Sequence, residues 1–266
     1  MTDPIDPELL TYELADGIAR IGLNRQAKRN ALSDRVIDAL ETAIVKANRE
    51  AGAVVLFGHG DHFSAGLDLA EHAERTLIEG IANSRRWHDV FTRIERAPVP
   101  WFSVLHGGAI GGGLELAAST HVRIAGDNAF FALPEGTRGI FVGGGGSVRI
   151  ARLIGASRMT DMMLTGRVVT PVEAERWGLV HYVVPAGQQM AKALELAARA
   201  AGNAPFSNYA IIEALPRIQD MGRDEGLFLE SLVASVASAT PEAHARLRAF
   251  LDRKEGKVAA PPGAGQ

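Results

Sequence analysis

Strand-like and helical segments alternate along the first two thirds of the chain, joined by short connections. Residues 53–57 form an apolar run of strand length, whereas residues 33–51 carry apolar side chains at helical spacing, with Ser33 as a candidate cap. Near the N-terminus, Asp16-Gly17 is a residue pair that tight hairpins favour. This alternation predicts an α/β fold.

The pattern changes after Pro185, where the sequence predicts no further strand. Three later segments have helical character: 189–202, 207–215 and 225–251. We therefore expect three parts: an α/β core at 1–185, a helical region at 186–258 and a tail at 259–266. The tail (AAPPGAGQ) is expected to be disordered, because such a composition cannot bury a core.

Length and charge limit the possible classes of protein. The 266 residues suffice for one large domain, or for one domain with an appended subdomain. A formal net charge of −3, with scattered lysines and arginines, argues against a nucleic-acid partner. No apolar run approaches the ~18 residues of a membrane span, and the N-terminus resembles neither a secretory signal nor a transit peptide. The lack of cysteines excludes disulfides and thiol catalysis and fits a cytoplasmic protein.

Two glycine-rich turns are the first candidates for a binding site: 62–68 (HFSAGLD) and 106–115 (HGGAIGGGLE). Each follows a predicted strand and opens a predicted helix. Glycine lets the backbone approach a ligand closely, and the first amides of a helix, which have no intrahelical acceptors, favour negative charge. Either turn alone is explained by tight packing, but their equivalent positions favour function. Neither matches the nucleotide-binding patterns G-x-G-x-x-G or G-x-x-x-x-G-K-[ST].

Glu115 lies in an otherwise apolar helix start, Leu114-Glu-Leu-Ala-Ala. A carboxylate there is expected to be largely buried, which is costly unless the group is paired or has a chemical task. The alternative to a chemical task is a structural ion pair, with Arg123 or Arg138 as partner.

Glu135 repeats this feature at the end of the apolar segment 129–133. Taken alone, it is more typical of a helix cap or a turn. However, two carboxyl groups that each leave an apolar element beside a glycine-rich turn are what paired general acid and base chemistry requires.

His59, His62 and Ser64, in or just before the first turn, predict no further chemistry. His59 and His62 lack the HExxH spacing, and no Asp or His set follows at metal-site spacing. We expect solvated loop histidines and no metal site. Ser64 is not in a nucleophile elbow, because His62 occupies the position of the first glycine.

The order and spacing of these motifs resemble the enoyl-CoA hydratase/isomerase (crotonase) superfamily from about Leu10 to Lys254. The matching segments are Asn24-Arg25 with Asn30-Ala31-Leu32; 63–69 (FSAGLDL); Gly107 with 111–117 (GGGLELA); Pro134-Glu135; Gly139-Ile140 with 143–146 (GGGG); 164–166 (LTG); Ala174-Glu175 with 177–180 (WGLV); and Phe250-Leu251 with Arg253-Lys254. The resemblance implies a spiral of ββα units with a C-terminal helical trimerisation region. It also implies a homo-oligomer, either a trimer or a dimer of trimers.

The resemblance further implies roles for individual residues. The backbone N–H groups of Leu67 and Gly112 match the two oxyanion-hole donors, which hold the thioester oxygen as an enolate forms. Glu115 and Glu135 match the two catalytic glutamates of true hydratases, one activating water and the other delivering a proton to the alpha carbon. The residues that match the CoA-binding strip are Lys28, Arg29, Ala31, Ser64, Ala65, Gly66 and Asp68.

The retained glutamate pair favours addition of water across the 2,3 double bond of a 2-enoyl-CoA. No metal or redox cofactor is expected, and coenzyme A enters as part of the acyl-CoA thioester substrate. The alternatives within the family are an enoyl-CoA isomerase, a hydroxyacyl-CoA dehydratase, and a hydratase specialised for methylthioacryloyl-CoA or cinnamoyl-CoA. A non-catalytic acyl-CoA-binding scaffold would keep the glycine turns but would have no reason to bury two carboxylates.

Three positions depart from the family pattern. Phe141-Val142 stands where a proline is frequent, and residues 101–107 read WFSVLHG in place of VIAAVNG, two changes that bear on the shape of the acyl pocket. Ile212 stands where many relatives carry lysine, which puts in doubt a contact that a neighbouring subunit often makes with a CoA phosphate. The residues that line the acyl pocket are expected mostly within 70–96, where motif matching fails.

Overall fold

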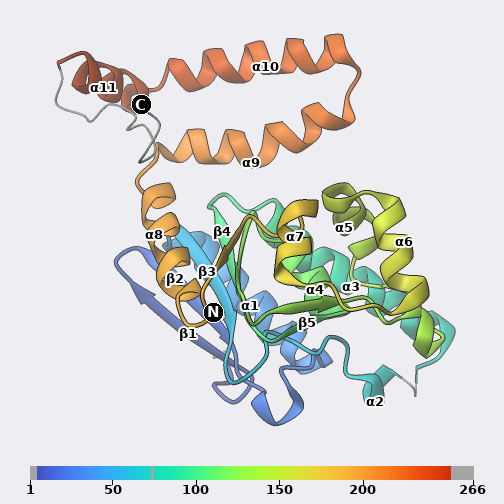
Figure 1. Cartoon of the computed structure of the whole chain (residues 1–266). Helices are drawn as coiled ribbons and strands as arrows, with labels where there is room; N and C mark the ends of the chain where they lie inside the picture. Colours follow the sequence, from blue (N-terminus) through green and yellow to red (C-terminus); the bar gives the residue numbers. More distant parts are fainter. Residues whose placement is uncertain (1–4, 73–74, 253–266) are drawn as a thin grey trace, which may run out of the picture. The chain divides into compact units, whose positions relative to one another are not determined.

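The structure is a computed structural model that describes residues 5–72 and 75–252. The chain divides into two compact units, Met1–Gly202 and Asn203–Gln266 (Figure 1). The predicted tail at 259–266 lies outside the described residues. None of the helices in the described ranges has both the length and the apolar character needed to cross a membrane.

A six-stranded sheet forms the centre of the first unit, with the strand order β1-β2-β3-β4-β6-β8. Its strands are β1 (Leu10–Ala15), β2 (Ile18–Leu23), β3 (Ala53–Gly58), β4 (Trp101–Leu105), β6 (Val122–Gly126) and β8 (Tyr182–Val184). β1 and β2 form the predicted hairpin, in which Asp16 (φ 53°) and Gly17 (φ 73°) adopt the left-handed conformation that a two-residue turn requires. The other neighbouring pairs are parallel, so their carboxyl ends lie along one edge of the sheet.

A second, two-stranded parallel sheet pairs β5 (Gly108–Ile110) with β7 (Phe130–Ala132). Isolated bridges extend this layer, since Ser64 pairs with Ala109 and Leu32 pairs with Leu67. The chain therefore passes repeatedly from the large sheet to the small layer and then into a helix, as the predicted spiral requires. The two glycine-rich turns lie side by side, because Ser64 belongs to one of them and Ala109 to the other.

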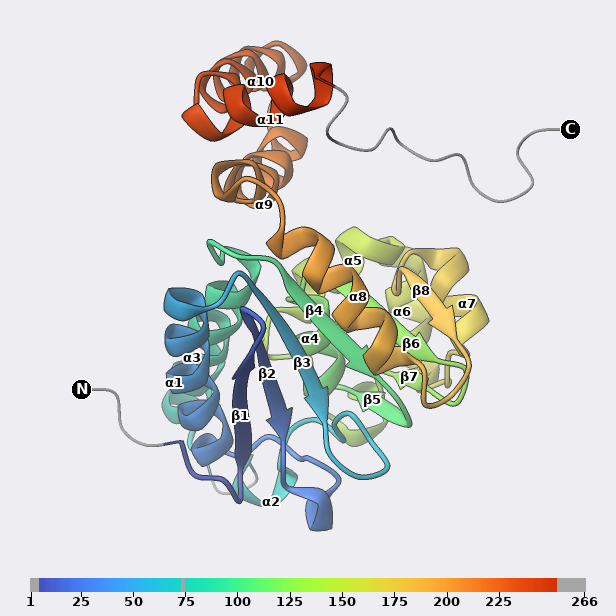
Figure 2. The same cartoon turned by 90° about the vertical axis from the view of Figure 1, so that its left-hand side faces the viewer.

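Helices cover both faces of the six-stranded sheet. Those that contribute to the main hydrophobic core include α1 (Asp34–Glu50), α3 (Leu77–Glu95) and α4 (Gly112–Ala118). On the opposite face, α8 (Gln189–Ala201) lies across the strands (Figure 2), and its Ala193 and Ala197 join a second core with Val55 and Phe102. Because of this packing, the first unit extends through α8 to Gly202, beyond the expected boundary at 185.

Local capping explains where two of these helices begin. Ser33 caps α1 as predicted, and its side chain accepts a hydrogen bond from the amide of Val36 at 3.3 Å. The segment 70–96 holds two helices, α2 (Leu69–His72) and α3. Thr76 and Glu79 form a capping box at the start of α3, in which each side chain accepts a hydrogen bond from the backbone amide of the other residue. The remaining helices of the first unit are α5 (Gly146–Ile154), α6 (Ala156–Thr165) and α7 (Pro171–Trp177).

The second unit is entirely helical where it is described. It contains α9 (Pro205–Asp220), α10 (Arg223–Ser238) and α11 (Pro241–Leu251), of which α9 and α10 pack against each other. Its exposed large hydrophobic side chains include Ile211, Leu215, Leu227, Phe228, Leu232, Val236, Leu247 and Phe250. Ile212, in contrast, is buried.

Candidate active site

Glu115 lies in the first turn of α4 and is buried, with 3% of its surface exposed. Its Oε1 accepts two hydrogen bonds of 2.8 Å, from the amides of Gly144 and Gly146. Burial raises the pKa of Glu115, while these amides and the nearby Arg149 guanidinium act in the opposite direction. The burial predicted for this carboxylate is confirmed, and its hydrogen bonds favour the ionised form.

The ion pairs considered for Glu115 do not form. The Arg123 guanidinium is buried and donates hydrogen bonds to the carbonyl oxygens of Thr120 and Leu179. Arg138 lies at the end of the short 3₁₀ helix η2 (Gly136–Arg138), where its charge acts on Glu135. Among the described residues, the direct hydrogen-bond partners of Glu115 are therefore backbone amides.

Glu135 follows β7 and immediately precedes η2. It is 6% exposed, and its Oε2 is buried without a hydrogen-bond partner among the described residues. Burial raises the pKa of Glu135 to about 7, and the charge of Glu115 acts in the same direction. Near neutral pH this carboxyl group therefore retains a proton much of the time.

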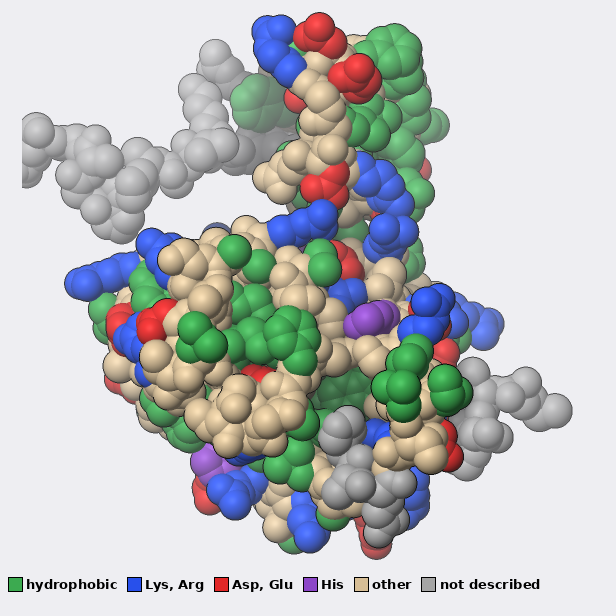
Figure 3. Space-filling model, turned by 90° about the vertical axis from the view of Figure 1, so that its right-hand side faces the viewer, with side chains coloured by type: hydrophobic (Ala, Val, Ile, Leu, Met, Phe, Trp, Pro, Cys, Tyr) green, Lys and Arg blue, Asp and Glu red, His purple; other side chains and the backbone are tan. Residues whose placement is uncertain are grey.

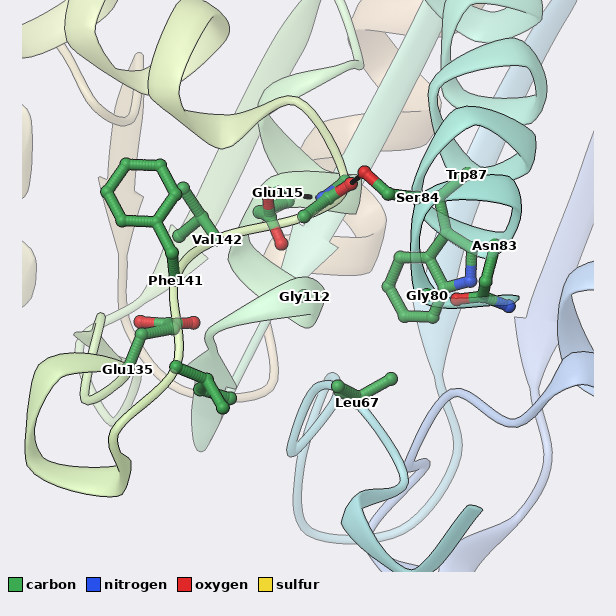
Figure 4. A pocket seen from close by; sticks show the side chains of 13 residues that line it. Leu67, Gly80, Asn83, Ser84, Trp87, Gly112, Glu115, Glu135, Phe141 and Val142 are labelled. Carbon is green, nitrogen blue, oxygen red and sulfur yellow. Dashed lines mark hydrogen bonds between the residues drawn. The ribbon is translucent and has the colours of Figure 1, made fainter. Parts of the chain in front are cut away.

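Glu115 and Glu135 face one cavity, although they are twenty positions apart in sequence (Figure 4). The cavity has a volume of about 70 Å³, several times what a single water molecule requires. It lies on the side of the first unit that carries α3, α5 and α6, where hydrophobic side chains border a hollow in the surface (Figure 3). The two predicted glutamates are thus brought together at one site.

The amides of Leu67 and Gly112 belong to adjacent segments at the same cavity. A β-carbon built on Gly112 would lie 3.4 Å from the Leu67 nitrogen, and one built on Gly66 would lie 3.0 Å from the Gly112 nitrogen. Within the described part of the chain, neither amide has a hydrogen-bond acceptor. Gly112 is the first residue of α4, where an amide has no intrahelical acceptor. Two unpaired amides beside one cavity are what an oxyanion hole requires.

A second groove begins at Leu67 and contains most of the predicted CoA-binding strip. The predicted residues that line it are Lys28, Arg29, Ala31, Ala65 and Asp68, and Arg138 lines it as well. Asp68 forms an ion pair with Arg25 at 2.6 Å, which neutralises its charge. The other charged residues of this lining are the cations Lys28, Arg29 and Arg138. Arg138 was not assigned to the strip from the sequence.

Ser64 and Gly66 shape the loop beside this groove. Ser64 is fully buried; its hydroxyl donates a hydrogen bond to the carbonyl of Asn30 at 2.7 Å and accepts one from the amide of Gly66 at 3.1 Å. Gly66 has a φ of 86°, which favours glycine, and a β-carbon there would collide with the backbone of Ile110. These two residues therefore hold the backbone that presents Leu67.

Helix α3 forms one wall of the cavity. It supplies pocket residues that motif matching in the sequence could not identify. Gly80, Ser84 and Trp87 line the cavity at spacings of four and three residues, so they share one helix face. The Ser84 hydroxyl donates to the carbonyl of Gly143 at 2.7 Å and joins α3 to the opposite wall. The Trp87 indole packs against Gly112, where an added β-carbon would lie 2.8 Å from the ring. The sequence shows the helical spacing of these residues, but such spacing does not distinguish a helix face that lines a pocket from one that packs in the core.

His59 and His62 are half-buried, and each makes a hydrogen bond. His59 Nε2 lies 2.7 Å from the Thr11 hydroxyl, and His62 Nδ1 accepts a hydrogen bond from the amide of Gly108 at 2.9 Å. Both side chains thus contribute to packing of the turns. In the described ranges, no group of three or more His, Asp or Glu side chains is placed to hold a metal ion.

The family model described as Enoyl-CoA hydratase/isomerase matches residues 13–257 of the chain. The chain belongs to the enoyl-CoA hydratase/isomerase family. Among curated relatives, the 2,3-dehydroadipyl-CoA hydratase of Escherichia coli (strain K12) is 34% identical over 87% of this chain and 91% of its own length. The short-chain-enoyl-CoA hydratase of Clostridium acetobutylicum is 32% identical over 90% of this chain and 92% of its own length.

Solved structures of family members have the same fold. A protein of Rhodopseudomonas palustris CGA009, provisionally described as an enoyl-CoA hydratase, is 50% identical with a TM-score of 0.91. That similarity covers 94% of this chain and 96% of the other. These comparisons confirm the predicted superfamily and the crotonase-like α/β fold. They also confirm the prediction of a hydratase-type enzyme that acts on an acyl-CoA thioester.

Proposed function

We propose that this family member adds water across the 2,3 double bond of a 2-enoyl-CoA and uses Glu115 and Glu135 as its base and acid. The observation that carries the proposal is that two buried carboxyl groups share one cavity with the unpaired amides of Leu67 and Gly112. Moving a double bond between carbons can be done by one carboxylate. Adding water requires a base for the water and an acid for the alpha carbon, so the pair favours hydration.

In the proposed reaction, ionised Glu115 takes a proton from water as the water oxygen bonds to the beta carbon. The electron pair of the double bond shifts toward the thioester carbonyl, and the amides of Leu67 and Gly112 stabilise the resulting enolate oxygen. Glu135 then donates its proton to the alpha carbon, which completes the addition of H and OH. Exchange with solvent removes the proton gained by Glu115 and restores the one lost by Glu135.

The surroundings of the two carboxyl groups support this division of roles. Oε1 of Glu115 accepts two amide hydrogen bonds, which favour the carboxylate. The charge of Glu115 in turn helps to raise the pKa of Glu135, whose Oε2 has no donor among the described residues. Two carboxyl groups with different proton affinities provide a base and an acid at the same pH.

We place the CoA moiety in the groove beside Leu67, because this residue lines both the groove and the cavity. A thioester at that junction would reach the Leu67 amide with its carbonyl oxygen. The cationic side chains of Lys28, Arg29 and Arg138 would then face the phosphates. No redox cofactor enters this proposal, since water addition transfers no electrons to or from the protein. No metal enters it either, because Glu115, Glu135 and the two amides supply the base, the acid and the stabilisation of the enolate oxygen.

We further propose a homotrimer or a dimer of trimers. Large hydrophobic side chains are exposed along α9, α10 and α11, and contact with neighbouring subunits would remove them from water. Analytical ultracentrifugation at micromolar concentration should give three or six times the chain mass, and a monomer alone would contradict the proposal. Ile212 is buried, so we expect no phosphate contact from this position. The cytoplasmic location stays a prediction of the sequence.

The experiment is a panel of enoyl-CoA thioesters, assayed by loss of the enoyl absorbance. Two relatives suggest the first substrates, a short-chain enoyl-CoA such as crotonyl-CoA and 2,3-dehydroadipyl-CoA. Beyond Ser84 and Phe141 the cavity opens into a wider groove with Leu77 and Ile81, so long-chain, methylthioacryloyl and cinnamoyl thioesters belong in the panel. Hydration of at least one supports the proposal. Binding without turnover would favour a scaffold, and shift of a 3-enoyl double bond without water addition would favour an isomerase.

A further inference from the structure

We propose that Arg149 is a positioning residue for the hydration reaction, because it fixes the turn whose amides hold Glu115. The inference rests on the proposed function, in which Glu115 activates water. Arg149 is not among the residues that line the catalytic cavity, so it would act through this turn and not through contact with substrate.

The Arg149 guanidinium joins two separate parts of the fold. Its side chain is only 9% exposed, and three of its nitrogens each donate a hydrogen bond. Nε donates to Oε2 of Glu95 at 2.8 Å, and Nη2 donates to the hydroxyl of Thr92 at 2.9 Å, both on α3. Nη1 donates to the carbonyl oxygen of Gly144 at 3.0 Å, in the turn before α5. A planar guanidinium bonded at three points fixes its neighbours in a way that a lysine cannot reproduce.

Gly144 links Arg149 to Glu115. Its carbonyl accepts the hydrogen bond from Arg149, and its amide donates to Oε1 of Glu115 at 2.8 Å. Gly145 follows with a φ of 95°, and a β-carbon there would collide with Nη1 of Arg149. The turn is therefore folded directly over the guanidinium. A shift of Gly144 away from α3 would carry away a donor that holds the catalytic carboxylate.

The positive charge of Arg149 also favours the carboxylate form of Glu115, as the hydrogen bonds of the turn do. It opposes the effect of burial on the pKa of Glu115 and so favours the ionised form that the reaction needs. The other ionisable side chains near this turn and Glu115 are Glu95, which pairs with Arg149, His88 beside Gly145, and Glu135. Without Arg149, Glu115 would be less firmly held and easier to protonate.

The test compares Arg149→Met and Arg149→Lys with a matched control, Arg93→Met. Arg93 also joins α3 to a carboxylate on another helix, Glu41 of α1 at 3.3 Å, and like Arg149 it lies outside the cavity lining. Unlike Arg149, its ion pair does not involve the turn that holds Glu115. We expect Arg149→Met to lower kcat by ~10–100-fold with KM within ~3-fold, since a small displacement of a reacting group has effects of this size. Arg149→Lys should fall between this variant and wild type, and Arg93→Met should keep the wild-type kcat.

A second readout separates positioning from general stability. In Arg149→Met the acid limb of the kcat/KM profile should move to higher pH, because Glu115 loses a neighbouring positive charge. The control should leave the limb in place. If Arg149→Met does not fold, Thr92→Val removes one acceptor of the guanidinium with little change in volume, and we expect a several-fold lower kcat.

A folded Arg149→Met variant with the wild-type kcat and pH profile would overturn the inference. The proposed function would survive that result if Glu115→Gln were inactive in the same assay. If the wild-type protein hydrated no enoyl thioester of the panel, the proposed function would fail and the inference with it.

Discussion

Gly146 constrains Glu115 in two ways. Its amide donates a 2.8 Å hydrogen bond to Oε1, and a β-carbon at Gly146 would lie only 2.7 Å from Cγ of Glu115. The glycine at this position therefore both holds the carboxylate and leaves it room. Since Gly146 is the first residue of α5, the orientation of Glu115 depends on where that helix begins.

Gly146→Ala tests this relationship. The added methyl group must displace Glu115, because both residues are buried and no space lies between them. We expect kcat for hydration to fall by ~10–100-fold, as for other small displacements of a reacting group. Gly226→Ala is the control, since Gly226 is also a buried helical glycine but does not line the cavity, and the nearest atom to an added β-carbon there is Cγ2 of Ile218 at 3.3 Å. Similar rates for the two alanine variants would contradict the account.

Leu67 provides a test of the oxyanion hole. Its amide is the proposed donor, so Leu67→Ala should retain much of the activity. Leu67→Pro removes the N–H and should lower kcat by ~10²–10³, the usual cost of losing one oxyanion donor. Proline also constrains the backbone, so circular dichroism must show that the variant is folded. Normal turnover by a folded proline variant would exclude Leu67 as a donor.

The pH dependence of kcat/KM should have two limbs. Glu135, with a pKa of about 7, must be protonated to act as the acid, so activity should fall as the pH rises through this value. Glu115 must be ionised, so activity should also fall in acid, at a pH above the usual pKa of a glutamate. The residual activity of Glu135→Gln should lack the alkaline limb. A wild-type profile that is flat from pH 6 to 9 would contradict the assigned acid.

Glu135 should also make stability depend on pH. Its pKa is about 7 in the folded protein and near 4.5 in the unfolded chain, so the folded state binds the proton more tightly. The stability linked to this proton is fully present below pH 4.5 and is lost as the pH rises through 7. Glu135→Gln avoids the loss and should gain ~1–3 kcal/mol relative to wild type at pH 8, and less at pH 5. Thermal unfolding at both pH values checks this, and an equal gain at both would be inconsistent with a buried, titrating Glu135.

Local sequence features predicted several elements correctly because the physical cause was itself local. Asp16-Gly17 adopts the positive φ angles of a hairpin turn, and Ser33 caps α1. Glu115 was recognised as a buried carboxylate from its apolar neighbours alone. Its partners could not be predicted in this way, because the amides of Gly144 and Gly146 come from a turn about thirty residues later.

The features that sequence reasoning missed depend on contacts between distant segments. Arg138 lines the groove beside Leu67, and Arg149 bonds α3 to the turn before α5. Neither residue has a local pattern that distinguishes it from an arginine on a solvated helix face. The same holds for the boundary after Gly202, since only the packing of α8 on the sheet assigns that helix to the first unit.

The central claim is that Glu115 and Glu135 act together as base and acid, and the initial rate of hydration by their glutamine variants tests it most directly. With a substrate that the wild type hydrates, Glu115→Gln and Glu135→Gln should each lower kcat by at least ~10², with KM changed no more than a few-fold. The double variant should be little slower than the slower single variant, because the two groups act as a unit. If either folded single variant hydrates this substrate at the wild-type rate, the two-glutamate mechanism is wrong.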